Sequence, residues 1–491
     1  MRRWLIPLVL GGASATGFAP LNWWFAILLC FAGLIALMER ARTLRSALIT
    51  GWWFGLGHFT IGLNWIATAF YFQDAMPHWL GWIAVILLSL YLAVYPAAAV
   101  GLAWRWGKPE LIPLSLTFAA AWIVTEWMRA TMFTGFAWNP LGVTLVEIGT
   151  VSRWIGTYGL SAIAVLAAGA LAALGVRKWR DGLILAVPIA ATALVTLLGP
   201  ATPPDKALIL RVVQPNINQN EKYSEELFAT NIRRLVQLTG YPGALPRLVL
   251  WPEAAIPYRL EEDAEARAAF AKLLGPDDIL LTGGDALVRD ERGELIAARN
   301  SLFALDARGR ILARYDKAHL VPYGEYLPMR PILSTIGLSR LVPGDIDFLP
   351  GPGPQSYALP GFGHVGVQIC YEIIFSGEVV DRKNRPDFLF NPSNDAWFGA
   401  WGPPQHLAQA RMRAIEEGLP VIRSTPTGIS AVVDASGKVR RNVSWQQQGA
   451  VSTRLPAPVP LTLFARWGNI LPLFFAALLT AISIAVRRRP R

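Results

Sequence analysis

Cysteine and histidine are scarce in this chain of 491 residues, which contains two cysteines and five histidines. Cys30 lies within an apolar run, and Cys370 lies far from it in the sequence. This usage excludes a disulfide framework and a zinc site built on cysteine ligands. The histidines are scattered without the spacing of metal ligands. We therefore expect no metal, and nothing in the sequence calls for another cofactor.

Charged residues are also few. They make up 16% of the chain, against 53% hydrophobic residues, so the chain is too apolar to be wholly soluble. Twenty tryptophans agree with this, because indole rings favour membrane interfaces. The net charge of +11 lies mainly in short clusters between apolar runs and in the arginines that close the chain. This distribution favours a membrane bilayer as partner and disfavours nucleic acid.

Eight apolar stretches have the length needed to cross a bilayer, which is about 20 residues of helix. They cover residues 4–19, 22–38, 47–71, 79–104, 111–131, 155–176, 182–199 and 467–486. The first could pass for a signal peptide, but further spans follow it at once, so we expect it to be retained. The sequence thus predicts a membrane domain over residues 1–200 with seven helices. An eighth helix and a basic tail lie within residues 456–491.

Positive charge marks every second connection between these stretches, with Arg153 and Arg466 as single exceptions. By the positive-inside rule, both termini are cytoplasmic and the long segment between spans seven and eight lies outside. Span five carries two ionisable residues, Glu126 and Arg129, whose spacing predicts an ion pair on one helix face. Direct contact with a lipid headgroup is the alternative.

Residues 203–455 have the composition of a soluble domain. Strand-like runs at residues 207–213, 248–251, 278–281 and 388–390 alternate with helical patterns at 222–238, 264–274 and 404–417. Hairpin signals at 306–309 and 434–437 add antiparallel strands. The pattern predicts a layered α/β sandwich outside the membrane.

Three residues of reactive type follow strand-like runs in this domain: Glu253, Lys317 and Cys370. A free cysteine is usually a small packing residue, which is the plainer interpretation of Cys370. As a nucleophile it needs a nearby base or cation, because the ordinary pKa of a thiol is about 8.5. Glu253 has the chemistry of such a base, and Lys317 that of an oxyanion stabiliser.

The contexts of these residues resemble those of the nitrilase, or carbon-nitrogen hydrolase, superfamily, on residues 250–253, 314–322 and 368–372. A closer resemblance, over nearly the whole chain, is to its membrane-embedded branch, the apolipoprotein N-acyltransferase family. It rests on Pro-Tyr-Gly-Glu-Tyr-Leu-Pro at 322–328, Asn-Pro-Ser-Asn-Asp-Ala-Trp-Phe-Gly at 391–399, and segments 405–407 and 410–414. The resemblance implies an αββα sandwich beside eight transmembrane helices, with Glu253, Lys317 and Cys370 as a catalytic triad.

The same resemblance implies further roles. Glu325, Tyr371 and Glu372 match supporting residues of the active site. The reaction implied is transfer of an acyl chain from a phospholipid, with phosphatidylethanolamine as the expected donor, through a thioester on Cys370. The acceptor would be the α-amine of the diacylglyceryl-modified N-terminal cysteine of an apolipoprotein. The location implied is the bacterial inner membrane, with the catalytic domain in the periplasm. Residues 424–428 depart from the family's usual turn.

Two segments are candidate covers over the site. They are residues 329–349 and the aromatic loop 396–402, which contributes Trp397, Phe398 and Trp401 as a possible lipid gate. The alternative interpretation is that these aromatic residues pack in the domain core. Two other functions remain open: a tethered amidase acting on small soluble amides, and a transporter or receptor. The chain has neither a Gly-x-Ser-x-Gly elbow nor a phosphate-binding Gly-x-x-x-x-Gly-Lys loop, which disfavours a serine hydrolase or an ATPase.

Overall fold

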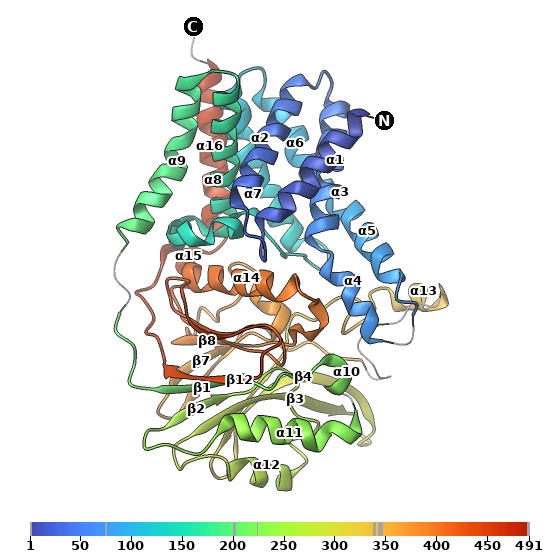
Figure 1. Cartoon of the computed structure of the whole chain (residues 1–491), viewed down its shortest axis with the longest axis vertical. Coiled ribbons are helices and arrows are strands. Elements are labelled where there is room, and N and C mark those ends of the chain that lie inside the picture. Colours follow the sequence, from blue (N-terminus) through green and yellow to red (C-terminus); the bar gives the residue numbers. More distant parts are fainter. Residues whose placement is uncertain are drawn as a thin grey trace.

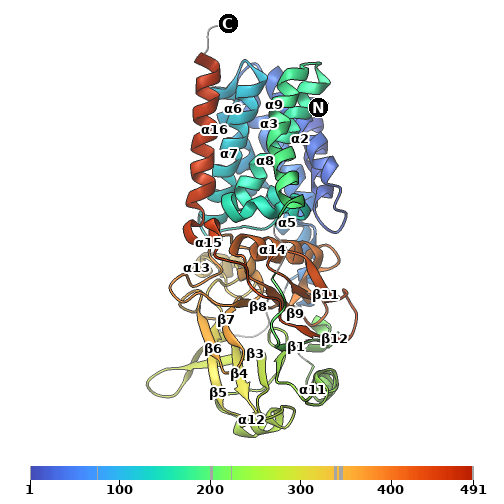
Figure 2. The ribbon, with the colours of Figure 1, turned by 90° about the vertical axis from the view of Figure 1, so that its left-hand side faces the viewer.

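The computed structural model describes residues 2–73, 76–199, 203–222, 224–336, 340–341 and 347–488. It has two parts, a bundle of apolar helices and a sandwich of two sheets (Figures 1 and 2). The bundle consists of α1 (Arg2–Ser14), α2 (Trp24–Arg40), α3 (Leu44–Gly62), α4 (Trp65–Ala69), α5 (Leu80–Leu92), α6 (Val94–Gly107), α7 (Leu111–Thr131), α8 (Ser152–Gly175), α9 (Trp179–Leu197) and α16 (Ile470–Arg488). α1 begins and α16 ends in the part of the bundle remote from the sandwich.

Among the described residues, five helical segments are long and apolar enough to cross a membrane, by length and composition. They are Leu80–Gly107, Leu111–Thr131, Leu141–Gly175, Trp179–Leu197 and Ile470–Arg488. The three other predicted spans coincide with α1, α2 and α3, of which α1 and α2 are only 13 and 17 residues long. These apolar helices support the predicted membrane domain, while the count of eight spans stays a prediction.

Glu126 and Arg129 lie at the end of α7 nearest the sandwich, and no ion pair within the described residues joins them. Glu126 instead accepts hydrogen bonds from Leu141 N at 2.7 Å and Ser161 Oγ at 2.5 Å. Arg129 Nη1 donates to the carbonyls of Phe136 and Trp138 at 2.9 and 2.8 Å. The predicted pairing is thus wrong, because the chain that returns after α7 offers backbone partners to both side chains.

The sandwich contains two six-stranded sheets formed by described residues. The first has the order β12-β1-β2-β3-β4-β5, with β1 (Ile209–Gln214), β2 (Arg247–Leu250), β3 (Ile279–Arg289), β4 (Leu295–Asp306), β5 (Ile311–Asp316) and β12 (Gly449–Arg454). The second has the order β11-β10-β9-β8-β7-β6, with β6 (Ser356–Leu359), β7 (Gly363–Val367), β8 (Phe388–Pro392), β9 (Val421–Ser424), β10 (Ser430–Val433) and β11 (Val439–Val443). Each sheet has three parallel strands at its centre, β1 to β3 and β7 to β9. Because β2, β8 and β9 are covered on both faces, every residue in them is buried, without the alternation of a half-exposed strand.

Helices cover the outer face of each sheet. α11 (Glu225–Thr239) and α12 (Ala264–Ala271) lie on the first sheet, and α14 (Gly402–Glu417) lies on the second (Figure 1). The predicted αββα arrangement is therefore present. α14 begins with prolines in its first turn and ends at Gly418, whose φ of +66° provides a left-handed cap. Shorter helices are α10 (Gln219–Lys222), α13 (Arg330–Leu333) and α15 (Leu463–Trp467).

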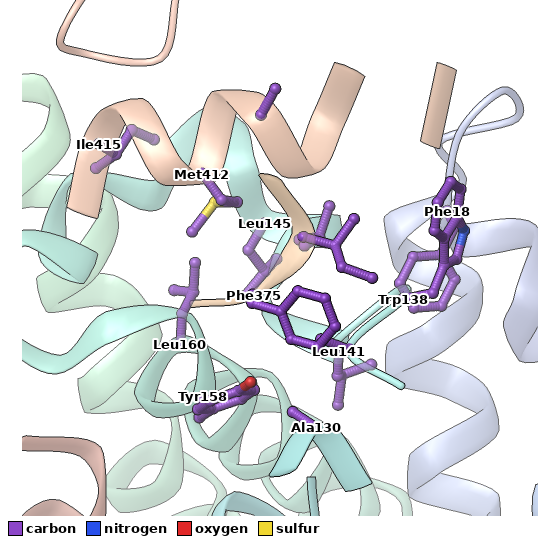
Figure 3. Close-up of a cluster of buried hydrophobic side chains, with 14 of the residues drawn as sticks. Phe18, Ala130, Trp138, Leu141, Leu145, Tyr158, Leu160, Phe375, Met412 and Ile415 are labelled. Carbon is purple, nitrogen blue, oxygen red and sulfur yellow. The ribbon is translucent and has the colours of Figure 1, made fainter. Parts of the chain in front are cut away.

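α14 also forms the junction between sandwich and bundle. Figure 3 shows its Met412 and Ile415 facing Leu145 and Leu160 of the bundle, within one continuous cluster of buried side chains. Polar bonds cross the same junction. Gln405 accepts from Trp138 Nε1 at 2.8 Å and donates to Gly62 O at 3.3 Å, and Glu416 accepts from the backbone and hydroxyl of Thr157. The two parts are joined by a packed core.

Candidate active site

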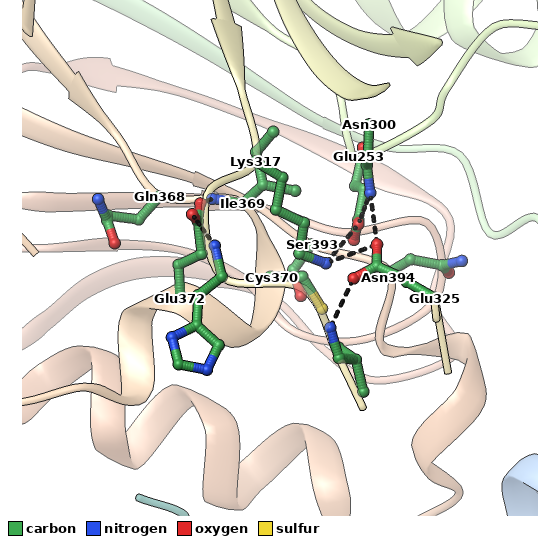
Figure 4. A network of polar contacts seen from close by, with 12 residues as sticks. Glu253, Asn300, Lys317, Glu325, Gln368, Ile369, Cys370, Glu372, Ser393 and Asn394 are labelled. Atoms are coloured by element: carbon green, nitrogen blue, oxygen red, sulfur yellow. Dashed lines mark hydrogen bonds and ion pairs between the residues drawn. The ribbon is translucent and has the colours of Figure 1, made fainter. Parts of the chain in front are cut away.

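The three predicted catalytic residues each follow a strand. Glu253 lies three residues after β2, Lys317 directly after β5, and Cys370 at the start of the 3₁₀ turn Cys370–Ile374 that follows β7. Glu253 and Lys317 come from the first sheet and Cys370 from the second. Their side chains converge between the sheets, where all three are buried. In Figure 4 the sulfur of Cys370 points toward Lys317 and the carboxylates.

Lys317 is held by two carboxylates. Its Nζ lies 2.9 Å from Glu325 Oε1 and 3.4 Å from Glu253 Oε1. Asn300, from β4, donates to the same two oxygens, at 3.0 Å for Glu325 and 2.7 Å for Glu253. The second oxygen of Glu325 accepts from Val321 N at 2.8 Å, which fixes the loop after Lys317. The predicted supporting role of Glu325 thus corresponds to direct contact with the lysine, and Asn300 is a member of the cluster that sequence reasoning missed.

The charges in this cluster stabilise one another. Burial lowers the pKa of Lys317, but the negative charges of Glu325 and Glu253 outweigh burial and raise it above its usual range. Burial raises the pKa of Glu253, but the positive charges of Lys317 and Lys222 outweigh burial and lower it below its usual range. Glu253 is therefore ionised at neutral pH. Its Oε2 is buried and has no hydrogen-bond partner among the described residues, so this oxygen is available to accept a proton.

The surroundings of Cys370, by contrast, disfavour the ionised form of its thiol. Burial, and then the negative charge of Glu253, raise the pKa of its thiol to about 12, against the effect of Lys317. The resting group is thus a neutral thiol, and its proton must leave as the sulfur attacks. The arrangement suits a general base, Glu253, acting on a thiol beside a fixed positive charge, Lys317, that stabilises a developing oxyanion.

The chain matches known families over both of its parts. Residues 10–170 match the family described as apolipoprotein N-acyltransferase N-terminal domain, and residues 210–458 match carbon-nitrogen hydrolase. Among curated proteins, an apolipoprotein N-acyltransferase of Rhodopseudomonas palustris is 34% identical over 100% of this chain and 96% of its own length. Proteins of the same name from Bradyrhizobium diazoefficiens and Rhizobium rhizogenes are 35% and 34% identical, over 99% and 92% of this chain and 95% and 90% of their own lengths.

The chain belongs to the apolipoprotein N-acyltransferase family. The predicted family, the enzyme class of an N-acyltransferase and the nitrilase-like fold are therefore confirmed.

Glu372 and Tyr371 each bind segments next to the site. Glu372 accepts from Tyr315 OH, Ala318 N and His319 N on one oxygen and from Ile369 N on the other, at 2.6 to 3.1 Å. It therefore ties the loop after Lys317 to the turn that carries Cys370. Tyr371 OH donates to Gly135 O of the bundle at 3.4 Å.

The pH dependence of acylation follows from these states. Between about pH 6 and about pH 8, we expect the rate of Cys370 acylation to vary less than about threefold, because Glu253 stays ionised and Lys317 stays charged. The measurement is the initial rate of adduct formation by intact mass. A rise of about tenfold per pH unit would instead indicate that the Cys370 thiol loses its proton to solvent before the sulfur attacks. Burial raises the pKa of Glu372 to about 7, so Glu372→Gln identifies any inflection that this carboxyl causes.

The aromatic loop lies where the sandwich meets α4. Phe398 is buried, and its ring centroid is 4.6 Å from that of Trp65 and 5.6 Å from that of Trp138. Trp397 lies 5.9 Å from Phe72, and Trp401 directly precedes α14. Phe398 is thus a packed residue, as in the alternative interpretation, while Trp397 and Trp401 are partly exposed. Of the other proposed cover, residues 337–339 and 342–346 lie outside the described residues.

One group of described residues has the composition of a metal site. Ligand atoms of Cys370, Asp395 and His406 all lie within 4.8 Å of one another. The nitrogens of His406 and the carboxylate of Asp395 already have protein partners, namely the Cys370 carbonyl, Ser393 Oγ and Arg423. The observed bonds account for this group as a hydrogen-bond network, and the expectation that no metal is needed stays a prediction.

Proposed function

We propose that this protein transfers an acyl chain from a membrane phospholipid, with phosphatidylethanolamine as donor, to the α-amine of the N-terminal S-diacylglyceryl cysteine of apolipoproteins. The observation that carries the proposal is the buried cluster of Glu253, Lys317 and Cys370, in a chain of the apolipoprotein N-acyltransferase family. A buried thiol with a base and a cation beside it suits covalent acyl transfer.

In the first half-reaction, Glu253 takes the proton of the Cys370 thiol as the sulfur attacks the ester carbonyl of the phospholipid. Lys317 stabilises the oxyanion of the tetrahedral intermediate. The carbon–oxygen bond of the ester then breaks, and Glu253 returns the proton to the departing lysophospholipid. A thioester on Cys370 remains.

In the second half-reaction, the amine of the acceptor attacks the thioester carbonyl. Glu253 takes a proton from this nitrogen, the carbon–sulfur bond breaks, and the proton passes to the sulfur. The products are an amide and the free thiol. Water is a competing nucleophile at this stage, and the burial of the cluster favours the amine by limiting water.

The proposed setting is the bacterial inner membrane, with eight transmembrane helices, both termini cytoplasmic and the sandwich in the periplasm. The proposed boundaries are residues 1–200 for the membrane domain, 203–455 for the catalytic domain and 456–491 for the last helix and basic tail. Two observations support this arrangement: a helix coincides with each predicted span, and the arginine and lysine clusters lie on alternate connections. Trp397 and Trp401 are proposed to border the entry of lipid from the bundle side.

The test is to incubate the purified chain with phosphatidylethanolamine of defined chains and to measure its intact mass. We expect one acyl adduct, which a diacylglyceryl-cysteine peptide then discharges with formation of an amide. No adduct with any phospholipid, together with hydrolysis of small soluble amides, would refute the proposal in favour of a tethered amidase.

A further inference from the structure

The backbone of Cys370 is in a conformation that side chains other than glycine rarely adopt. Its φ is +50°, in the left-handed region, a strained conformation that persists only where neighbouring groups enforce it. Two side chains hold its carbonyl oxygen: His406 Nε2 at 3.1 Å and Asn391 Nδ2 at 3.3 Å. The direction in which the sulfur points depends on this backbone, so these donors bear on the nucleophile although they do not touch the sulfur.

The ring of His406 is itself fixed through its other nitrogen, Nδ1. It is fully buried on α14, and its Nδ1 lies 3.0 Å from Asp395 Oδ1. Asp395 is fixed by Arg423 at 2.5 Å and by Ser393 Oγ at 2.7 Å. Arg423 Nη2 also lies 2.9 Å from His406 Nδ1. A carbonyl oxygen only accepts, so Nε2 must carry a hydrogen whether the ring is neutral or charged.

The other faces of the ring contact aromatic residues from the junction. The ring centroid lies 5.1 Å from that of Trp138, which precedes the bundle segment Leu141–Val151, and 5.9 Å from that of Phe398 in the aromatic loop. The imidazole is therefore enclosed by the second sheet, α14 and the bundle. The ring can therefore move little, and a group must itself be immobile to fix the backbone that it binds.

We propose that His406 is a positioning residue for the nucleophile: its Nε2–H, held in place by Asp395 and Arg423, keeps the Cys370 carbonyl and hence the left-handed backbone that directs the sulfur toward Lys317 and Glu253. The lipid readout of this proposal rests on the proposed function, whereas its thiol readout does not.

Two substitutions distinguish the hydrogen bond from Nε2 from the packing of the imidazole ring. In His406→Gln the side-chain amide nitrogen reaches about the position of Nε2, so the bond to the Cys370 carbonyl is kept. In His406→Asn the amide nitrogen reaches only about the position of Nδ1, so the contact with Asp395 is kept and the carbonyl loses the nearer of its two donors, with Asn391 remaining. Both variants are made in full-length protein carrying Cys30→Ala, which leaves Cys370 as the single thiol.

The first readout is alkylation of Cys370 by iodoacetamide, followed by intact mass at one pH. We expect His406→Asn to react about 10- to 100-fold more slowly than the parent, the fold-change for loss of one buried hydrogen bond. His406→Gln should recover most of the rate, while both variants melt within a few degrees of each other. The second readout, acylation by phospholipid, should follow the same order.

The outcomes are distinct. Equal alkylation rates in the two variants, or rates that follow melting temperature, overturn the proposal. If the parent itself takes no acyl chain from phospholipid, the proposed function fails, and the alkylation series still decides the role of His406.

A measurement on the unsubstituted protein covers the case in which His406→Asn does not fold. With ¹⁵N-labelled imidazoles, assigned through His406→Gln, the Nε2 of His406 must carry a hydrogen throughout the pH range of the folded state. An Nε2 without a hydrogen, as in a ring bound to a metal through that atom, overturns the proposal.

Discussion

Replacing Cys370 by alanine is expected to abolish the acyl adduct and to lower acyl transfer by about 10⁴-fold or more, because it removes the thiol proposed to carry the acyl chain. The thiol is buried beside Glu253 and Lys317, and alanine keeps the site's packing while removing only the sulfur. The measurement is intact mass after incubation with phospholipid, together with amide formation on a diacylglyceryl-cysteine peptide.

The matched control for this substitution is Cys30→Ala. Cys30 is the other cysteine of the chain and is also buried, but it lies on α2 within the bundle. This variant should form the adduct at the rate of the parent. An adduct that persists in Cys370→Ala would show that the acyl chain is carried elsewhere, and the two-step mechanism would be wrong.

Replacing Lys317 by alanine is expected to slow acylation by about 10²- to 10³-fold, the usual effect of removing one group that stabilises an oxyanion. The fold should persist. Without the ammonium, Glu253 and Glu325 become two neighbouring buried carboxylates that share the contact of Asn300. The amide of Asn300 still donates to both oxygens, which limits the loss of stability.

The rate of adduct formation and the melting temperature together test this prediction. Lys206→Ala is the control, since Lys206 also pairs with a carboxylate, Asp387 at 3.2 Å, but is partly exposed and lies outside the cluster. It should leave both quantities unchanged. The prediction is wrong if Lys317→Ala unfolds under conditions in which the control stays folded. The lysine would then be required for the fold, and its effect on the rate would be indirect.

The catalytic candidates could be predicted because each combines a reactive side chain with the end of an apolar strand. Strand ends are visible in sequence: β2, β5 and β7 each run into the segment that carries Glu253, Lys317 or Cys370. Asn300 gave no such signal, because it lies within β4 and its amide is not a reactive type. Its neighbours in the strand, Arg299 and Ser301, are also polar, so the local pattern did not single out Asn300. The edge strands β6 and β12 were also missed, since pairing with a neighbour, and not local pattern, makes them strands.

Contacts between distant segments were the least predictable. The pairing of Glu126 with Arg129 followed from helix spacing, but residues 136–141 return to the end of α7 and provide better partners. Phe398 was assigned to a gate from its place in a loop, and it packs against Trp65 of the bundle. The bond from His406 to the Cys370 carbonyl joins a helix to a turn in a different part of the sandwich, and no local pattern encodes it.

The position of α14 limits how such proteins can be engineered. One face of this helix completes the sandwich, and the other belongs to the bundle's interior, where Gln405 and Glu416 bind Trp138 and Thr157. A sandwich excised from the chain would leave these polar groups unpaired beside newly exposed apolar side chains. The two parts are therefore not interchangeable modules: a chimaera that joins this sandwich to a foreign anchor would first need a new surface on α14.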